Sequence, residues 1–96
     1  MNANTMLFYQ NNTWGEFKLH RNEYTGKIPR AFDMVDDEIY LTPIEIAEVL
    51  EVNEETVRRW CRQGKLKVVS PTGRYKILGA DLKEFLYQWW RKDLIK

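Results

Sequence analysis

Two helix-start signals lie close together near the middle of the chain, and they constrain the fold more than any other feature. The first is the run TPIE at 42–45, where threonine suits the N-cap, proline the first helical position and glutamate a capping box. The second is Asn53, an N-cap residue before a helix predicted over 54–63, with Gly64 as its C-terminal stop. Two short helices joined by a tight turn are therefore predicted.

The segments around this helix pair predict an α+β fold. A short strand is expected at 39–41, a strand at 65–69, a turn at 70–73, a returning strand at 74–78 and a last helix over about 81–94. This order is that of a small winged helix-turn-helix, with two short helices, a two- to three-stranded wing sheet and a C-terminal helix.

The second helix of the pair has one apolar side and one charged side. At about 100° per residue, Val57, Trp60 and Cys61 fall inward, Glu55, Arg59 and Arg62 fall outward, and Arg58 lies at the border. A recognition helix in a DNA major groove presents its polar side in this way.

Basic residues are concentrated in one part of the chain. Residues 1–40 carry four Lys or Arg and six Asp or Glu, whereas residues 41–96 carry eleven and eight, so the net charges are −2 and +3. The segment 58–76 holds seven basic residues and no acidic one. Such a block favours a nucleic-acid face, with an ordinary solvated charged face as the alternative.

Residues 41–86 are similar throughout to the excisionase-type branch of the MerR-like winged helix-turn-helix superfamily. The matching motifs, in order, are LT…EIAEVL, ETVRRW, GKL, GRYKI and DLKEFL. Glu51 departs from the pattern, because it stands in the turn where the family usually has glycine. A left-handed conformation there would cost a non-glycine residue on the order of 1 kcal/mol.

The resemblance implies a mode of DNA binding. In that family the second helix enters the major groove and the wing reaches the adjacent minor groove, so Glu55 and Arg59 resemble base-reading positions, Arg58 a phosphate contact and Arg74 the wing arginine. The full set of expected DNA-binding residues is Glu55, Thr56, Arg58, Arg59 and Arg62 on the recognition helix, with Lys65, Lys67, Thr72, Arg74 and Lys76 on the wing and its flanks.

The resemblance also implies a function, with two alternatives. We expect sequence-specific binding of double-stranded DNA by an excisionase-like recombination directionality or architectural factor of a mobile element, with a recombinase (integrase) or further copies of the chain as partners. A transcription regulator or plasmid segregation factor could use the same MerR-like domain. A protein–protein interaction module with a vestigial helix-turn-helix is the alternative of another class.

Other functional classes lack the residues they need. One cysteine and one histidine cannot form a His/Cys metal cage, and the adjacent Glu54 and Glu55 do not suggest acid–base catalysis. We therefore expect no enzyme, no cofactor, no metal and no small-molecule substrate. The chain has no apolar run of about 20 residues and no signal pattern at its N-terminus, which predicts a cytoplasmic, nucleoid-associated protein without a membrane partner.

The chain is expected to divide into an N-terminal extension, 1–38, and the winged helix-turn-helix, 39–96. Apolar runs at 6–9 and 14–19, separated by turn residues, predict a β-hairpin. The extension is rich in aromatic residues, and we expect it to pack on the last helix and cover Trp90. The alternative is that Trp90 lies in a contact between protomers. The stripe expected to close the winged-helix core consists of Leu82, Phe85, Leu86 and Trp89.

Overall fold

The computed structural model describes residues 3–70 and 74–94, and the contacts divide the chain into two units. Unit 1 comprises residues up to Ile28 together with those from Glu84 onward, and unit 2 runs from Pro29 to Lys83. The last helix, α6 (Gly79–Leu94), begins in unit 2 and ends in unit 1. Among the described residues, no helix is both long enough and apolar enough to span a membrane.

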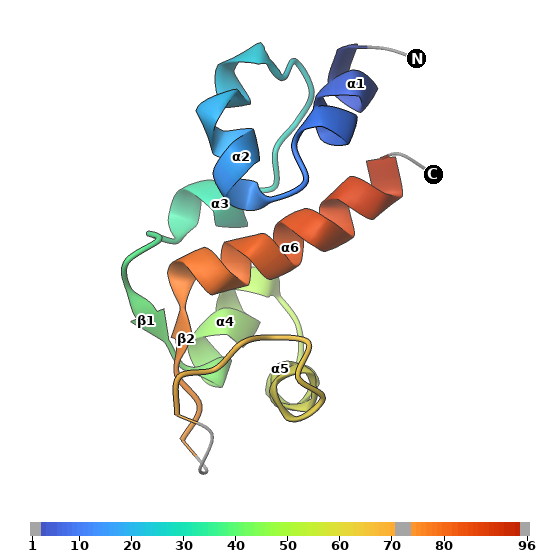
Figure 1. Ribbon diagram of the computed structural model, residues 1–96. Helices are drawn as coiled ribbons and strands as arrows, with labels where there is room; N and C mark the ends of the chain where they lie inside the picture. The colour runs from blue at the N-terminus through green and yellow to red at the C-terminus, as the bar shows by residue number, and fades with distance from the viewer. Residues whose placement is uncertain (1–2, 71–73, 95–96) are drawn as a thin grey trace. The chain divides into compact units, whose positions relative to one another are not determined.

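Unit 2 combines a helix pair with a two-stranded antiparallel sheet (Figure 1). Strand β1 (Tyr40–Leu41) pairs with β2 (Ile77–Leu78), and Leu41 lies opposite Ile77. The helices are α3 (Ala31–Met34), α4 (Pro43–Leu50), α5 (Glu54–Arg62) and the start of α6. The apolar core is made of Ala31, Phe32, Val35, Leu41, Ile46, Ala47, Val57, Cys61, Leu66, Ile77 and Leu82. A compact α+β helix-turn-helix fold is thus confirmed.

The predicted helix caps are present in unit 2. Thr42 Oγ1 accepts a hydrogen bond from the Glu45 amide at 3.3 Å, and Glu45 Oε1 accepts one from the Thr42 amide at 2.9 Å. These bonds from Thr42 hold the pKa of the Glu45 carboxyl below its usual value. At α5, Asn53 Oδ1 accepts from the Glu55 amide at 2.8 Å. The sequence prediction for the start of both helices is confirmed.

Glu51 adopts the left-handed conformation that the turn between α4 and α5 requires, with φ 57° and ψ 45°. Its amide donates to the Ala47 carbonyl, and the Val52 amide donates to the same oxygen at 3.0 Å. Two bonds to one carbonyl close the last turn of α4 and offset the conformational cost of a non-glycine residue there. The helix-turn-helix therefore keeps a tight turn without glycine.

The predicted strand at 65–69 is wrong. The amides of Lys65 and Leu66 both donate to the Trp60 carbonyl, at 3.0 and 3.3 Å, so the chain turns against the end of α5 rather than extending. Of the returning arm, only Ile77–Leu78 is a strand, and it pairs with β1. A single bond, from the Val69 amide to the Lys76 carbonyl at 2.9 Å, joins the two described arms.

Gly79 begins α6 at a point where the backbone is crowded. Its amide donates to the Ile39 carbonyl at 2.7 Å, and a Cβ built on Gly79 would lie 1.9 Å from the Asp36 carbonyl oxygen. Further along the helix, buried Lys83 forms an ion pair of 3.0 Å with Asp37. The segment before β1 is therefore fixed to the first turn of α6, which explains why 29–38 group with unit 2.

The β-hairpin predicted for the N-terminal segment is also wrong, because unit 1 is helical. It contains α1 (Ala3–Gln10), α2 (Trp14–Leu19) and the 3-10 turn η1 (Arg21–Glu23), which lie with the later part of α6 in Figure 1. Trp14 and Phe17 are both buried, which is the three-residue spacing of a helix face and not the alternation of a strand. The run 14–19 is too short for its composition alone to distinguish the two.

An aromatic cluster forms the core of unit 1. The ring of Phe17 lies 5.6 Å from Phe8, 5.7 Å from Tyr24, 5.2 Å from Tyr87 and 5.7 Å from Trp90, measured between centroids. Three of these rings come from the N-terminal segment and two from α6. Residues 8–24 therefore pack on the last helix through ring contacts.

Polar side chains of α6 bind the backbone of the N-terminal segment. The Tyr87 hydroxyl donates to the Asn11 carbonyl at 2.7 Å, and Arg91 Nε donates to the Phe8 carbonyl at 2.9 Å. A second guanidinium nitrogen of Arg91 donates to Asn12 Oδ1 at 2.8 Å. The first two bonds satisfy backbone carbonyls in the last turn of α1 and directly after it, and the third binds the side chain of Asn12.

The apolar stripe predicted for α6 is corrected at one position. Trp89, expected in the core, is 58% exposed, whereas Tyr87 is fully buried. The buried face turns along the helix, because the aromatic cluster takes Tyr87 and half-buried Trp90 at a three-residue spacing. The predicted apolar stripe assumed that α6 packs on a single core along its whole length, so it did not include this change of buried face.

Candidate nucleic-acid interface

Helix α5 has the orientation expected of a recognition helix. Val57 and Cys61 are buried, Trp60 and Arg58 are half-buried, and Glu55, Arg59 and Arg62 are exposed. Thr56 is half-buried in the first turn, and its amide donates to the Asn53 carbonyl. The helical-wheel prediction is confirmed, and the outward face of α5 is a surface of charged side chains.

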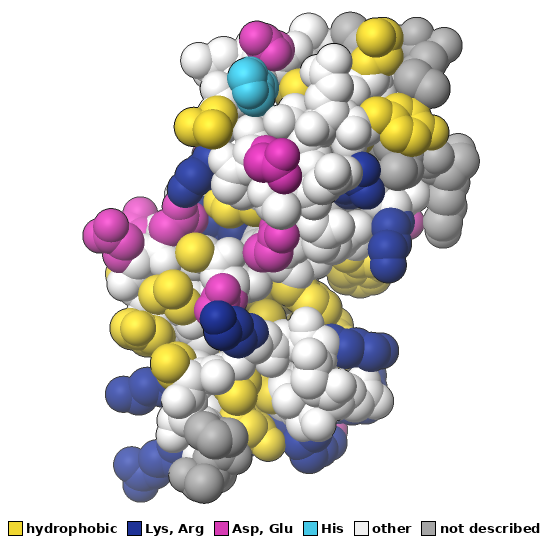
Figure 2. Space-filling view, viewed as in Figure 1, with side chains coloured by type: hydrophobic (Ala, Val, Ile, Leu, Met, Phe, Trp, Pro, Cys, Tyr) yellow, Lys and Arg dark blue, Asp and Glu magenta, His cyan; other side chains and the backbone are white. Residues whose placement is uncertain are grey.

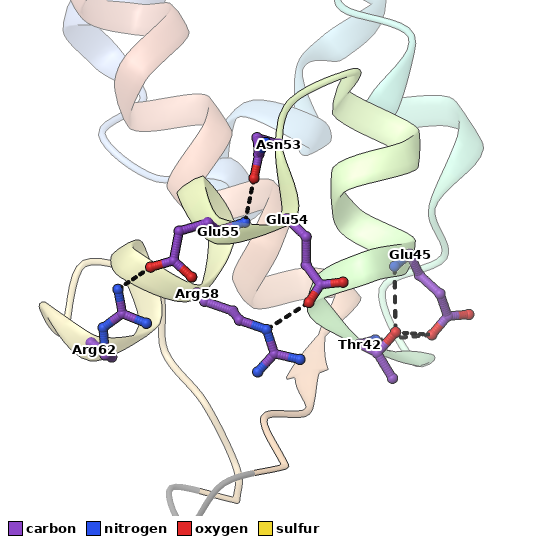
Figure 3. Close-up of polar contacts among 7 residues, drawn as sticks. All are labelled: Thr42, Glu45, Asn53, Glu54, Glu55, Arg58 and Arg62. Atoms are coloured by element: carbon purple, nitrogen blue, oxygen red, sulfur yellow. Dashed lines mark hydrogen bonds and ion pairs between the residues drawn. The ribbon is translucent and has the colours of Figure 1, made fainter.

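Two glutamates at the start of α5 hold two of its arginines (Figure 3). Glu54 Oε2 accepts a hydrogen bond from Arg58 Nε at 2.7 Å, and Glu55 Oε1 accepts one from Arg62 Nη2. The hydrogen bond from Arg62, with smaller contributions from the charges of Arg58 and Arg62, holds the pKa of the Glu55 carboxyl below its usual value. The face therefore presents ion pairs and not a row of separate cations.

Arg59 differs from the other two arginines of α5. Its side chain is exposed, and among the described residues it has no hydrogen bond or ion pair. A guanidinium in this state reaches a guanine or a phosphate without breaking an internal bond. Arg59 is thus the cation of α5 most available to a ligand.

The remaining predicted site residues lie beside α5 in the sequence. Lys65, Lys67, Arg74 and Lys76 are all exposed, whereas Thr72 lies outside the described residues. Figure 2 shows Lys and Arg side chains gathered around the end of unit 2 that carries α5 and the 65–76 segment. The structure thus places these basic side chains on the same unit as the exposed face of α5.

Cys61 and His20 show no arrangement of ligands for a metal. Cys61 is buried, and burial raises the pKa of its thiol, so the thiol is protonated at neutral pH. His20 lies at the exposed end of α2, with its Nδ1 3.8 Å from Glu23 Oε2. Within the part of the chain that the structure describes, no three His, Cys, Asp or Glu side chains come together as a metal site.

Sequence reasoning missed the two ion pairs of α5. The four-residue spacing of Glu54 and Arg58, with the acid nearer the N-terminus, is a known signal for a helical ion pair. Glu55 and Arg62 are seven residues apart, beyond the spacing of neighbouring turns, so their pairing depends on two long side chains lying along the helix.

Comparison with known families decides the class of this fold. A family model described as a helix-turn-helix domain matches residues 40–89, from β1 into α6. The chain belongs to the helix-turn-helix domain family. This is a family of DNA-binding domains. The searches found no significant match among curated proteins or among solved structures. The excisionase-type assignment stays a prediction.

Proposed function

We propose that this helix-turn-helix protein binds double-stranded DNA sequence-specifically through α5 and the basic segment 65–76. The observation that carries the proposal is the outward face of α5, which exposes Arg59 and Arg62 on the unit that also exposes Lys65 and Lys67. Membership of a DNA-binding family supports the same ligand. The net charge of the segment 58–76 fits a polyanion.

In the proposed complex, α5 lies in the major groove. Arg59 donates to O6 and N7 of a guanine, and Glu55 accepts from the amino group of a cytosine. Arg58 contacts a phosphate, and Arg74 enters the adjacent minor groove, where a narrow A·T-rich groove attracts arginine. The remaining contacts of the proposed interface, from Thr56, Arg62, Lys65, Lys67, Thr72 and Lys76, fix the position of the protein along the duplex.

The biological role that we propose is that of an excisionase-like architectural factor, which bends DNA at a recombination end. The similarity of residues 41–86 to the excisionase-type branch supports it. A bend of the bound duplex, measured by the mobility of circularly permuted fragments, tests the architectural part. An adjacent recombinase gene would favour this role over a transcription regulator or a segregation factor with the same domain.

The salt dependence of binding to random duplex DNA tests the DNA-binding proposal itself. If four to six basic residues meet phosphates, log Kd plotted against log salt changes with a slope of roughly 4 to 5 per protomer. Lys67→Gln should reduce this slope by about 0.9. Lys27→Gln, at an exposed lysine of unit 1, is the matched control and should leave the slope unchanged.

A protein that does not bind at 50 mM salt, or whose affinity is independent of salt, would contradict the proposal. That result would favour a protein–protein interaction module in which the helix-turn-helix no longer binds DNA. Fluorescence anisotropy with a labelled duplex gives both the affinity and the slope.

A further inference from the structure

The Glu55–Arg62 ion pair occupies the middle of the face that α5 turns outward. Two residues seven apart on a helix differ by only about 20° in direction, so this pair runs nearly parallel to the helix axis. Arg58 and Arg59 come between them in the sequence and point to either side of that line. In Figure 3 the Glu55 side chain reaches along the helix to Arg62.

Both members of this pair are charged and accessible. Arg62 is 50% exposed and Glu55 is 60% exposed, so a duplex placed against α5 would meet both side chains. The pKa of Glu55 is lowered and that of Arg62 is raised, each first by their mutual hydrogen bond. A duplex at neutral pH would therefore meet a carboxylate and a guanidinium already bound to each other.

We propose that the Glu55–Arg62 pair is a closed state of the recognition face, and that Glu55 determines specificity by withholding Arg62 from DNA that offers Glu55 no replacement partner. This inference rests on the proposed DNA binding and concerns how the same face selects its site. The Glu55 carboxylate thus weakens binding to DNA that offers it no partner and strengthens binding to DNA that offers one.

On random DNA, opening of the Glu55–Arg62 ion pair is unfavourable. The Arg62 guanidinium has donors besides the one bound to Glu55, but a phosphate on them would lie beside the Glu55 carboxylate, and the repulsion between the two anions offsets the contact. If the pair opened instead, the Glu55 carboxylate would lie unpaired beside the negative backbone and the acceptor atoms of the groove. The pair therefore stays closed, and Arg62 makes no phosphate contact.

A DNA site that offers Glu55 a new hydrogen-bond donor makes opening of the pair favourable. The amino group of a cytosine or an adenine in the major groove is a hydrogen-bond donor, so it can replace Arg62 as the partner of Glu55. Arg62 is then free to contact the duplex. Opening of the Glu55–Arg62 pair thus depends on the base opposite Glu55. A base that binds Glu55 therefore also allows Arg62 to make one additional contact with the DNA.

The Glu54–Arg58 pair provides a contrast on the same helix. Glu54 falls on the inward side of the wheel and both of its members are half-buried, so this pair borders the recognition face and does not cross it. A matched control must remove one negative charge without opening any ion pair. Glu48 on α4 meets this requirement, because it is exposed and has no hydrogen bond or ion pair among the described residues.

The experiment compares E55Q, R62Q, the double variant E55Q/R62Q and the control E48Q on random duplex DNA across a range of salt. Releasing Arg62 to one phosphate should steepen the log–log salt slope of E55Q by about 0.9 and tighten binding about 5- to 10-fold at 0.1 M salt. The slope of E55Q/R62Q should equal that of R62Q. On a selected site E55Q should gain less, so the ratio of specific to random affinity should fall.

Three results would overturn the inference, and they are distinguishable. If E55Q matches E48Q in slope and affinity while the unchanged protein binds DNA, the pair does not withhold Arg62. If glutamine at position 55 steepens the slope even in the R62Q protein, its effect is one of net charge and not of Arg62. If none of the proteins binds DNA, the proposed function fails and the inference fails with it. Circular dichroism melting of each variant establishes that it is folded.

Discussion

The two units of this small protein are stabilised in different ways. Unit 2 has an aliphatic core, with Ile46, Val57 and Ile77 fully buried, and its α4 and α5 begin with side-chain caps. Unit 1 has an aromatic core around Phe17, and long side chains of α6 bind its backbone carbonyls. The helix-turn-helix is therefore specified largely by local signals, whereas unit 1, although Thr13 caps α2, depends on contacts between distant parts of the chain.

The short helices of both units depend on packing. Helices α1, α2, α4 and α5 have eight, six, eight and nine residues, below the length of about 12 to 15 at which an isolated helix is even marginal in water. The units differ in where that packing comes from, because α1 and α2 pack on residues of α6 that lie far along the chain.

Phe17→Ala should have the largest effect, because it removes the ring at the centre of the aromatic cluster. Truncation of a buried phenylalanine costs about 3 to 5 kcal/mol, which should expose the amides of α1 and α2 to hydrogen exchange before those of α4. Leu19→Ala, at a side chain that is 78% exposed on the same helix, is the control. Equal loss of protection in α1 and α4 would contradict the contrast between the units.

Gly79→Ala should destabilise unit 2 by about 1 to 3 kcal/mol, since the new methyl group would overlap the Asp36 carbonyl and force the backbone to move. Gly15→Ala is the matched control on α2. Its Cβ would find its nearest neighbour, Thr13 Oγ1, at 3.8 Å, and alanine favours a helix by up to about 1 kcal/mol. The two variants should therefore shift the urea midpoint in opposite directions, and a neutral Gly79→Ala would contradict the packing described for the start of α6.

Tyr87→Phe should cost about 1 kcal/mol, because the Asn11 carbonyl loses its buried donor. The Tyr87→Phe substitution should also change how the free energy of unfolding depends on pH in the alkaline range. Burial raises the pKa of Tyr87 from 10.0 to about 12 in the folded protein, so its contribution to stability is full below pH 10 and is lost as pH rises toward 12.

The free energy of unfolding in urea, measured between pH 9 and 12, tests this expectation. The unchanged protein should lose stability more steeply over that range than Tyr87→Phe does. Tyr9→Phe, at an exposed tyrosine of α1, is the control. Parallel curves for the unchanged protein and Tyr87→Phe would show that the hydroxyl is not buried as described.

The sequence predicted the helix pair well, because its determinants are short-range. Thr42 and Glu45 lie within one turn, and Asn53 lies next to the helix that it caps. The inward and outward faces of α5 followed from helical periodicity. The caps and the two faces require knowledge of only a few neighbouring residues, whereas the left-handed turn at Glu51 was located by the resemblance to a family that usually has glycine there.

The features that the sequence did not predict depend on tertiary contacts. Trp14 and Phe17 are compatible with a strand until their cluster partners in α6 are known, and the same cluster is why Trp89 is exposed. The strand expected at 65–69 does not form, because the amides of Lys65 and Leu66 donate to the Trp60 carbonyl. Periodicity over a short run contains no information about any of these partners.

Recognition of bases by α5 is tested by the DNA affinities of the Arg59→Ala and Lys67→Ala variants, each measured on a selected site and on random duplex. If α5 reads bases, Arg59→Ala should cost about 1 to 3 kcal/mol on the site and almost nothing on random DNA, whereas Lys67→Ala should weaken binding to both by similar amounts. If the two variants lose affinity equally on both DNAs, Arg59 is only a phosphate contact and the outward face of α5 is not the surface that recognises sequence.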